Sequence, residues 1–395
     1  MSLVNMRDML NHAYSNGYAV GGFDLVSLDF LEAIVAAAEV KHSPVILSLA
    51  ESHFEFYDFE LAVVAAEQAA KRASVPMAIH LDHGASYDSA VRAINLGCNG
   101  VMVDASHSSF DENVAMTKQV VDMAHACGVP VEGELGYVAG VEGEDAEKHP
   151  GELVYTSIEE ASSYVAQTGV DLLAVSVGTV HGRMKGQPKL DFDRLNKINA
   201  SLNIPLVIHG GTGLSDDQFK QLITGGVAKI NYYTALADAA GNCMRDNVNA
   251  SRGNDYTGIT KGIQRAMRDE IERCMECWGS AGKADAVLSM STKWQPVHHV
   301  IIFNVENTSD EEAQNMMQEG ERILSKIPGV RRINTASAIT QNAKFQYSWL
   351  IEFVHPNVID SYREHPDHVA FADKLFRPIA GDRISIDYLQ NPGMT

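Results

Sequence analysis

Short apolar runs alternate with longer amphipathic segments along roughly the first 285 residues. This alternation is typical of βα units that build a parallel sheet, and almost continuously apolar runs fit strands buried on both faces. Eight strands are predicted, at residues 18–23, 44–49, 75–82, 100–104, 129–134, 171–177, 204–209 and 227–231. Eight βα units in this length predict a closed TIM (β/α)8 barrel. The alternative is an open doubly wound sheet, but GGFDLVS after the first strand is not the glycine-rich dinucleotide turn that such sheets usually carry.

The rhythm changes after Gly282, where a small, polar segment ending in proline predicts a linker. The remaining residues predict strands at 298–305, 330–339, 345–354 and 383–389, and helices at 310–327 and 358–379. This β-α-β-β-α-β order is the ferredoxin-like α+β pattern. We therefore expect a barrel at 1–286, a linker at 287–296 and a small α+β domain at 297–395.

Composition narrows the functional classes. With 51 acidic and 31 basic residues the formal charge is −20, which opposes binding to nucleic acid or to an anionic membrane. No apolar run is long enough to span a bilayer. Five scattered cysteines do not form a disulfide framework and favour a reducing, cytoplasmic setting. Cys274 and Cys277 form a CxxC inside a helix-like segment without the second pair that a zinc ribbon needs, so we expect two thiols on a helix.

The chemistry of a barrel of this kind lies at the C-terminal ends of its strands. Five consecutive predicted strands end in, or run into, an imidazole or a carboxylate: Asp82 and His83, Asp104, Glu134, His181, and His209. Three histidines from different strands, with one coordination position left open, suit a catalytic Zn²⁺, with Co²⁺, Mn²⁺ and Fe²⁺ as alternatives. His80 should lie deeper on the same strand face as Asp82 and is expected to be a packed, hydrogen-bonded core residue.

Two further features surround this rim. Glycines and small polar residues follow the sixth, seventh and eighth predicted strands, where barrels commonly bind phosphate: Gly182, Gly210, Gly211, Thr212, Asn231 and Thr234. The alternative is that these glycines only permit tight turns. The loop after the fifth strand carries Glu142 and is either a lid that supplies a general base or a solvated acidic loop.

Six motifs in one order, HLDHG, VMVDASH, VEGELG, VGTVHG, LVIHGGTG and AKIN, resemble class II metal-dependent fructose-bisphosphate and tagatose-bisphosphate aldolases. The resemblance runs from about residue 18 to residue 281. It implies a TIM barrel, a divalent metal, a phosphosugar substrate and a homodimer or homotetramer. Under it, His83, His181 and His209 match the catalytic zinc ligands. Asp104 and Glu134 match carboxylates near the metal or at a second position for a divalent or monovalent cation.

The same resemblance assigns the reacting groups. Asp82 matches the acid that protonates the aldehyde oxygen in cleavage, and Glu142 matches the lid glutamate that exchanges the donor's proton. Gly182, Gly210, Gly211, Thr212, Asn231 and Thr234 match the phosphate cradle, and Asp24 and Lys185 are further substrate-facing candidates. Asp24 stands where the family usually has asparagine, and Ala50 where a serine is common. We therefore expect aldol chemistry with an altered substrate preference.

HHVIIFNV, FQYSWLIEFV and SYREHPDHVAFADKLFRPI resemble the stress-responsive dimeric α/β-barrel (Dabb-type) domain. Such domains commonly pair two sheets across a dimer, so this part is expected to be an oligomerisation module. Two other functions stay open for the whole chain: a metal-dependent barrel lyase or isomerase acting on another phosphosugar, and a non-enzymatic sugar-phosphate-binding protein. The histidines and acids at the rim argue against the second of these.

Overall fold

The computed structural model describes residues 2–138, 140, 144–145, 154–183, 188–250 and 255–389. The chain divides into two compact units. One comprises Met1–Ala90, Cys98–Val121 and Pro130–Lys293, and the other Val91–Gly97, Asp122–Val129 and Trp294–Thr395. None of the helices in the described ranges is long and apolar enough to cross a membrane.

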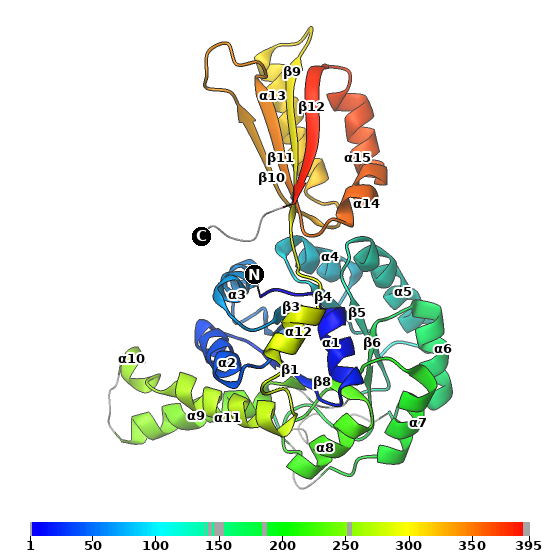
Figure 1. Cartoon of the computed structure of the whole chain (residues 1–395), viewed down its shortest axis with the longest axis vertical. Helices are drawn as coiled ribbons and strands as arrows, with labels where there is room; N and C mark the ends of the chain where they lie inside the picture. The colour runs from blue at the N-terminus through cyan, green and yellow to red at the C-terminus, as the bar shows by residue number, and fades with distance from the viewer. Residues whose placement is uncertain are drawn as a thin grey trace. The chain divides into compact units, whose positions relative to one another are not determined.

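The first unit is a closed barrel of eight parallel strands, as the apolar runs predicted (Figure 1). Its strands are β1 (Val20–Asp24), β2 (Val45–Ala50), β3 (Met77–Gly84), β4 (Gly100–Val103), β5 (Val131–Leu135), β6 (Leu172–Val175), β7 (Leu206–Ile208) and β8 (Val227–Tyr232). Each strand pairs with its neighbour in sequence, and β1 closes the barrel against β8, with Gly22 opposite Asn231. Nearly every strand residue is buried, because side chains fill the barrel on one face and helices cover the other.

Helices follow the strands around the barrel. They are α1 (Met6–Ser15), α2 (Leu28–Lys41), α3 (Phe59–Arg72), α4 (Tyr87–Leu96), α5 (Phe110–Ala126), α6 (Ile158–Thr168), α7 (Phe192–Leu202), α8 (Asp216–Thr224), α9 (Thr234–Asn249), α10 (Tyr256–Ile259), α11 (Ile263–Cys277) and α12 (Ala284–Met290), with a 3-10 turn at η1 (Glu51–His53). Both cysteines of the CxxC lie on α11, as expected.

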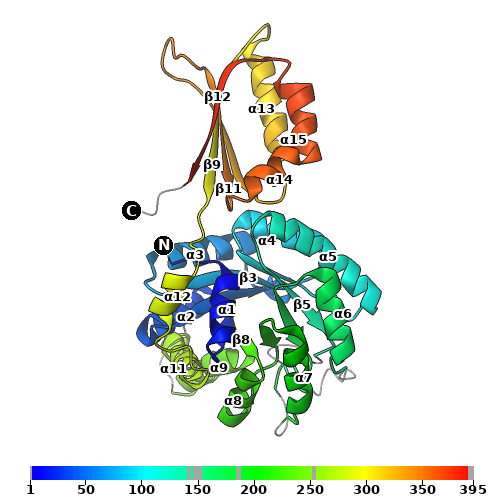
Figure 2. The same ribbon diagram turned by 45° about the vertical axis from the view of Figure 1, so that its right-hand side comes forward.

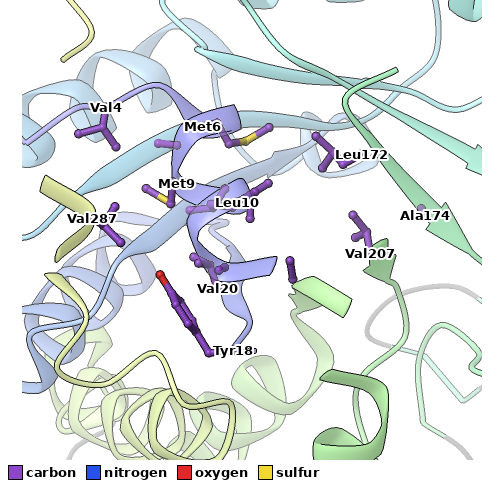
Figure 3. Close-up of a cluster of buried hydrophobic side chains, with 14 residues drawn as sticks. Val4, Met6, Met9, Leu10, Tyr18, Val20, Leu172, Ala174, Val207 and Val287 are labelled. Carbon is purple, nitrogen blue, oxygen red and sulfur yellow. The ribbon is translucent and has the colours of Figure 1, made fainter. Parts of the chain in front are cut away.

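Helix α1 closes the N-terminal end of the barrel (Figure 3). Its buried Met6, Met9 and Leu10 pack in one apolar cluster with the residues that begin several strands, among them Val20 and Leu172. Asn5 caps this helix by accepting hydrogen bonds from the backbone N–H groups of the first turn. Because this cluster fills the N-terminal end of the barrel, the polar side chains gather at the opposite end, where the strands end.

The structure differs from the sequence prediction at the start of the linker. Residues 287–290, the start of the predicted linker, belong to helix α12. Val287 is fully buried and joins the apolar cluster under the barrel, which explains why a polar-looking segment is helical: one apolar face is enough to anchor a short helix.

The second unit contains a four-stranded antiparallel sheet in the order β10-β11-β9-β12. Its elements are β9 (Val297–Val305), α13 (Asp310–Leu324), β10 (Val330–Ser337), β11 (Tyr347–Phe353), α14 (Val358–Glu364), α15 (Pro366–Phe371), η3 (Ala372–Phe376) and β12 (Ala380–Leu389). This is the predicted α+β order, and Figure 2 shows the helices gathered on one face of the sheet.

The single helix predicted at 358–379 is wrong, because the segment is broken at Pro366. Proline disfavours the α conformation in the residue before it, and His365 is extended, with ψ 132°. The chain restarts as α15 with Pro366 in its first turn, where the missing N–H is not needed.

Candidate active site

Three imidazoles meet at the C-terminal end of the barrel. His83 lies at the end of β3, His209 directly follows β7, and His181 lies in the loop after β6. One ligand atom from each lies within 4.8 Å of the others. The sequence predicted this convergence from strand ends alone.

Each ring is oriented by a partner on its outer nitrogen. His83 Nδ1 lies 2.8 Å from Asp104 Oδ2, and His209 Nε2 lies 2.9 Å from Glu132 Oε1. His181 Nδ1 lies 3.1 Å from the carbonyl oxygen of Val138. An oxygen acceptor that fixes the outer nitrogen of an imidazole is the usual arrangement behind a metal-ligating histidine.

Among the described residues, no oxygen acceptor lies within hydrogen-bond distance of the inner nitrogens. His83 Nε2 and His209 Nδ1 face each other at 2.9 Å. His181 Nε2 is buried and makes no hydrogen bond with a described residue. Burial, reinforced by the two neighbouring imidazoles, lowers the pKa of His181 to about 3, so the ring is neutral, the form in which histidine binds metal. The set therefore fits a divalent cation held by three nitrogens.

His83 has an unusual backbone. Its φ is +46°, in the left-handed region that non-glycine residues seldom occupy. Burial by itself would lower the pKa of His83, but the carboxylates of Asp82 and Asp104 outweigh it and raise that pKa well above its usual value.

Asp82 is fully buried beside these rings. The Nδ2 group of Asn231 donates to its two carboxylate oxygens, at 2.9 Å each. Burial tends to raise the pKa of Asp82, but His83 and Lys229 outweigh burial and lower it, which keeps the carboxylate charged. Asn231, which the sequence predicts in the phosphate cradle, directs its amide nitrogen at Asp82, and Nδ2 also lies 3.4 Å from His209 Nε2.

Two residues that sequence reasoning missed connect this site to the barrel interior. Glu132 on β5 and Lys229 on β8 are fully buried, with Lys229 Nζ 2.7 Å from Glu132 Oε2. Burial tends to raise the pKa of Glu132, but Lys229 and then His209 outweigh it and hold it at about 2. The available signal was a charged side chain within a predicted buried strand: Glu132 in VEGEL and Lys229 in VAKIN.

His80 differs from its expected state. It is fully buried, but neither ring nitrogen makes a hydrogen bond with a described residue, and Nε2 lies 3.6 Å from Glu132 Oε2. Burial, followed by the charge of Lys229, lowers its pKa to about 3, so the ring is neutral. His80 is therefore a packed residue, as predicted, without the predicted hydrogen bonds.

Carboxylates outnumber lysines in this buried cluster. Glu134 is buried, its Oε2 accepts no hydrogen bond from the described residues and lies 3.8 Å from His209 Nδ1, and burial followed by the charge of Asp104 raises its pKa. Two further groups of potential ligands share these side chains: Asp82, Glu132 and His209, and His83, Asp104 and Glu134. A cation would compensate this excess of negative charge.

The glycine-rich segment that follows β7 forms a tight turn. Gly210 has a φ of +70°, and a Cβ there would collide with the backbone of Val180. Thr212 Oγ1 accepts a hydrogen bond from Ala235 N, in the first turn of α9. That helix begins at Thr234, and its N-cap residue supplies no capping side chain. Loop and helix start therefore face one region, which suits an anion.

The other predicted residues fall in different places. Gly182, with a φ of +84°, follows His181, and Gly211 follows Gly210 on the same rim. Asp24 is fully buried at the end of β1. Burial, followed by the charge of Asp24, raises the pKa of Tyr57. Glu142 and Lys185 lie outside the described residues.

A closed (β/α)8 barrel with converging imidazoles and carboxylates at its C-terminal end defines a metal-site barrel enzyme. The comparisons identify its family. Residues 4–283 match the class II fructose-bisphosphate aldolases, and residues 297–390 match the stress-responsive A/B barrel domain. The chain therefore belongs to the class II fructose-bisphosphate aldolase family, and it is an aldehyde-lyase that carries a Dabb domain at its C-terminus. The family is generally metal-dependent.

Individual relatives agree. The chain is 42% identical over 289 residues to a probable fructose-bisphosphate aldolase of Bacillus subtilis (strain 168), covering 72% of this chain and 100% of that protein. It is 41% identical over 291 residues to the fructose-bisphosphate aldolase of Geobacillus stearothermophilus, covering 72% and 99%. Among solved structures, the YdjI aldolase of Escherichia coli K12 is 32% identical with a TM-score of 0.64, over 71% of this chain and 99% of that one.

Proposed function

We propose that this enzyme is a zinc-dependent aldolase that reversibly cleaves a ketose phosphate, such as fructose 1,6-bisphosphate, to dihydroxyacetone phosphate and an aldehyde. The observation that carries the proposal is the set of three inner imidazole nitrogens, each from a ring oriented by an oxygen acceptor on its outer nitrogen. The names of the relatives, fructose-bisphosphate aldolases, support the substrate class.

His83, His181 and His209 would hold the metal, with Asp104 and Glu134 close enough to share it or to hold a second cation. When bound, a divalent cation supplies Lewis-acid stabilisation of the negative charge that develops on the donor as the C3–C4 bond breaks. Nitrogen ligands with an open position suit Zn²⁺.

Asp82 is the proposed proton carrier. The hydroxyl oxygen that becomes the aldehyde loses its proton in cleavage, so Asp82, contrary to the direction expected from the resemblance, would act as general base in cleavage and return that proton as general acid in condensation. Asn231 restrains its carboxylate by donating to both oxygens. Glu142, from the loop after β5, is proposed from the family resemblance to exchange the proton of the donor.

The substrate's phosphate is proposed to bind where Gly182, Gly210, Gly211 and Thr212 approach the start of α9 at Thr234. Bare backbone N–H groups and the positive end of a helix favour an anion there. Asp24 adds a buried carboxylate at the same end of the barrel. Because a negative charge disfavours an anionic donor nearby, we propose that Asp24 changes the substrate preference within the family, and Lys185 remains a proposed phosphate contact.

The Dabb domain is proposed to make the enzyme a homodimer, which could assemble further into a tetramer. On β12, Ile384, Ile386 and Tyr388 are 41%, 42% and 50% exposed and alternate with residues that face the helices. A sheet face with this much exposed apolar surface is typical of a protein interface.

Five free cysteines support a reducing, cytoplasmic setting. The domain boundaries at 286 and 297 are likewise proposals.

The test is an assay of the zinc-loaded protein on fructose 1,6-bisphosphate and a panel of other ketose phosphates, with detection of triose phosphate release. His209→Ala should abolish both bound metal and turnover, whereas His12→Ala, at the closed end of the barrel, should change neither. A rearranged product without chain cleavage would point to an isomerase, and binding without turnover to a sugar-phosphate-binding protein; either result overturns the proposal.

A further inference from the structure

The C-terminal unit contains a cavity that the aldolase reaction does not use. Its volume is about 240 Å³, and its lining residues all lie between His299 and Asp387. Trp349, Ile351 and Phe353 of β11 form the wall on the sheet side, and Phe371 and Phe376 contribute from the helix side. The relatives compared above match 72% of the chain, through the barrel, so their activity does not account for this cavity.

The size and lining of the cavity suit one aromatic ring. An apolar cavity of about 150 Å³ is large enough to bind benzene, so 240 Å³ accommodates a ring with a short polar substituent. The edge-to-face pair of Trp349 and Phe371, with centroids 5.7 Å apart, shows that aromatic side chains of the sheet side and the helix side pack against each other in the lining.

A hydrogen-bonded pair of an imidazole and a carboxylate lies on the polar side of the cavity. His299 Nδ1 of β9 is 2.6 Å from Asp387 Oδ1 of β12. The imidazole stacks on Phe353, with ring centroids 5.7 Å apart, and thus forms part of the aromatic wall. Because His299 donates to Asp387, the carboxylate is partnered within the protein and is less able to repel an anion.

Three arginines line the same cavity. Arg363 and Arg377 form ion pairs with Asp360 and Asp373 on their own helical segments. Arg383 of β12 is exposed and has no ion pair or hydrogen bond from its side chain to any residue in the described part of the chain. Its guanidinium therefore provides an unneutralised positive charge in a geometry that suits a carboxylate.

We propose that this cavity is a binding site for a small aromatic carboxylate, with the ring among the apolar side chains of its lining and the carboxylate held by Arg383. The proposal does not depend on the function proposed for the barrel. It gives the C-terminal domain a ligand-binding role in addition to any role in assembly.

The test is calorimetric titration of the full-length protein with benzoate and with its neutral counterpart benzamide. We expect benzoate to bind about tenfold more tightly, because only benzoate gains the charge-assisted hydrogen bonds to Arg383. Arg383→Gln should remove this preference. Lys374→Gln, which removes an exposed positive charge near the cavity, is the matched control and should leave it unchanged.

Two variants separate charge from damage to the fold. Asp387→Asn removes a negative charge from the lining, so benzoate should bind as tightly as before or more tightly. Ser385→Trp, at an exposed position of the lining, should block both ligands while leaving the circular dichroism spectrum and aldolase activity intact. Equal binding of benzoate and benzamide, equal effects of Arg383→Gln and Lys374→Gln, or no benzoate binding at about 20 mM would each overturn the proposal.

Discussion

The buried ion pair between Lys229 and Glu132 offers a sharp test of how the barrel interior supports the active site. Lys229→Met keeps the length and apolar stem of the side chain and removes its charge. In the native structure Lys229 Nζ lies 2.7 Å from Glu132 Oε2, and neither side chain is exposed. Glu132 in turn accepts from His209 Nε2, so the substitution acts on a proposed metal ligand through one intermediate residue.

The expected loss of stability follows from burial. Removing one partner of a buried ion pair leaves an uncompensated charge, which typically destabilises a protein by about 3–5 kcal/mol. His209 still donates to Glu132, and His80 lies 3.6 Å away, so partial compensation places the expected value near the lower end, about 3 kcal/mol. Glu132→Gln in the Lys229→Met background removes the orphaned charge and should restore at least about 1 kcal/mol.

The assay is urea unfolding at neutral pH, combined with competitive zinc titration of the folded variants. Lys220→Met, on the exposed surface of α8, is the control and should change the free energy of unfolding by less than about 0.5 kcal/mol. Residues that orient a metal-ligating histidine commonly affect metal affinity by about 10–100-fold. We expect Lys229→Met to weaken zinc binding within that range.

The reasoning would be refuted by two results. If Lys229→Met unfolds at the same urea concentration as the native protein, the buried pair contributes no net stability. If its zinc affinity is unchanged while stability falls, then Glu132 does not orient His209. A double variant that is less stable than Lys229→Met alone would contradict the orphaned-charge explanation.

Three further predictions concern the rim, the dimer and the C-terminal unit. In urea unfolding, Gly210→Ala should destabilise the protein by more than about 1 kcal/mol, and by more than Gly213→Ala does. Both glycines have a positive φ, but only a Cβ at Gly210 would collide with backbone atoms. Equal losses of stability in the two variants would contradict this explanation. Ile386→Lys should convert the proposed dimer to monomer in sedimentation velocity without loss of secondary structure, and an unchanged sedimentation coefficient would exclude this face from the interface. Hydrogen bonds from Ser309 and Thr308 lower the pKa of Glu312. Its stabilising contribution is therefore fully present above the unfolded pKa and is lost as the pH falls through the lower pKa of the folded state. Glu312→Gln should lower the urea midpoint more at pH 7 than at pH 3.

Much of the fold follows from the sequence because barrel strands are nearly continuous apolar runs and their order in space equals their order in the chain. The same regularity places His83, His181 and His209 at one rim without any knowledge of distances. The sequence analysis predicts neither the break at Pro366 nor helix α12, which contains Val287. In the first case a proline signal was overlooked within an amphipathic pattern, and in the second a short apolar face was outweighed by polar composition.

The pairing of Glu132 with Lys229 illustrates why the rest of the site could not be predicted from the sequence. The two residues are 97 positions apart, on strands that are not neighbours in the barrel. Strand periodicity indicates that each is buried, which by itself argues against a charged residue at either position. Only closure of the barrel brings the ammonium to the carboxylate and the carboxylate to His209. The charge balance of the candidate metal site is therefore a property of the closed barrel. This explains why strand ends alone predict the candidate ligands but not the residues that orient and neutralise them.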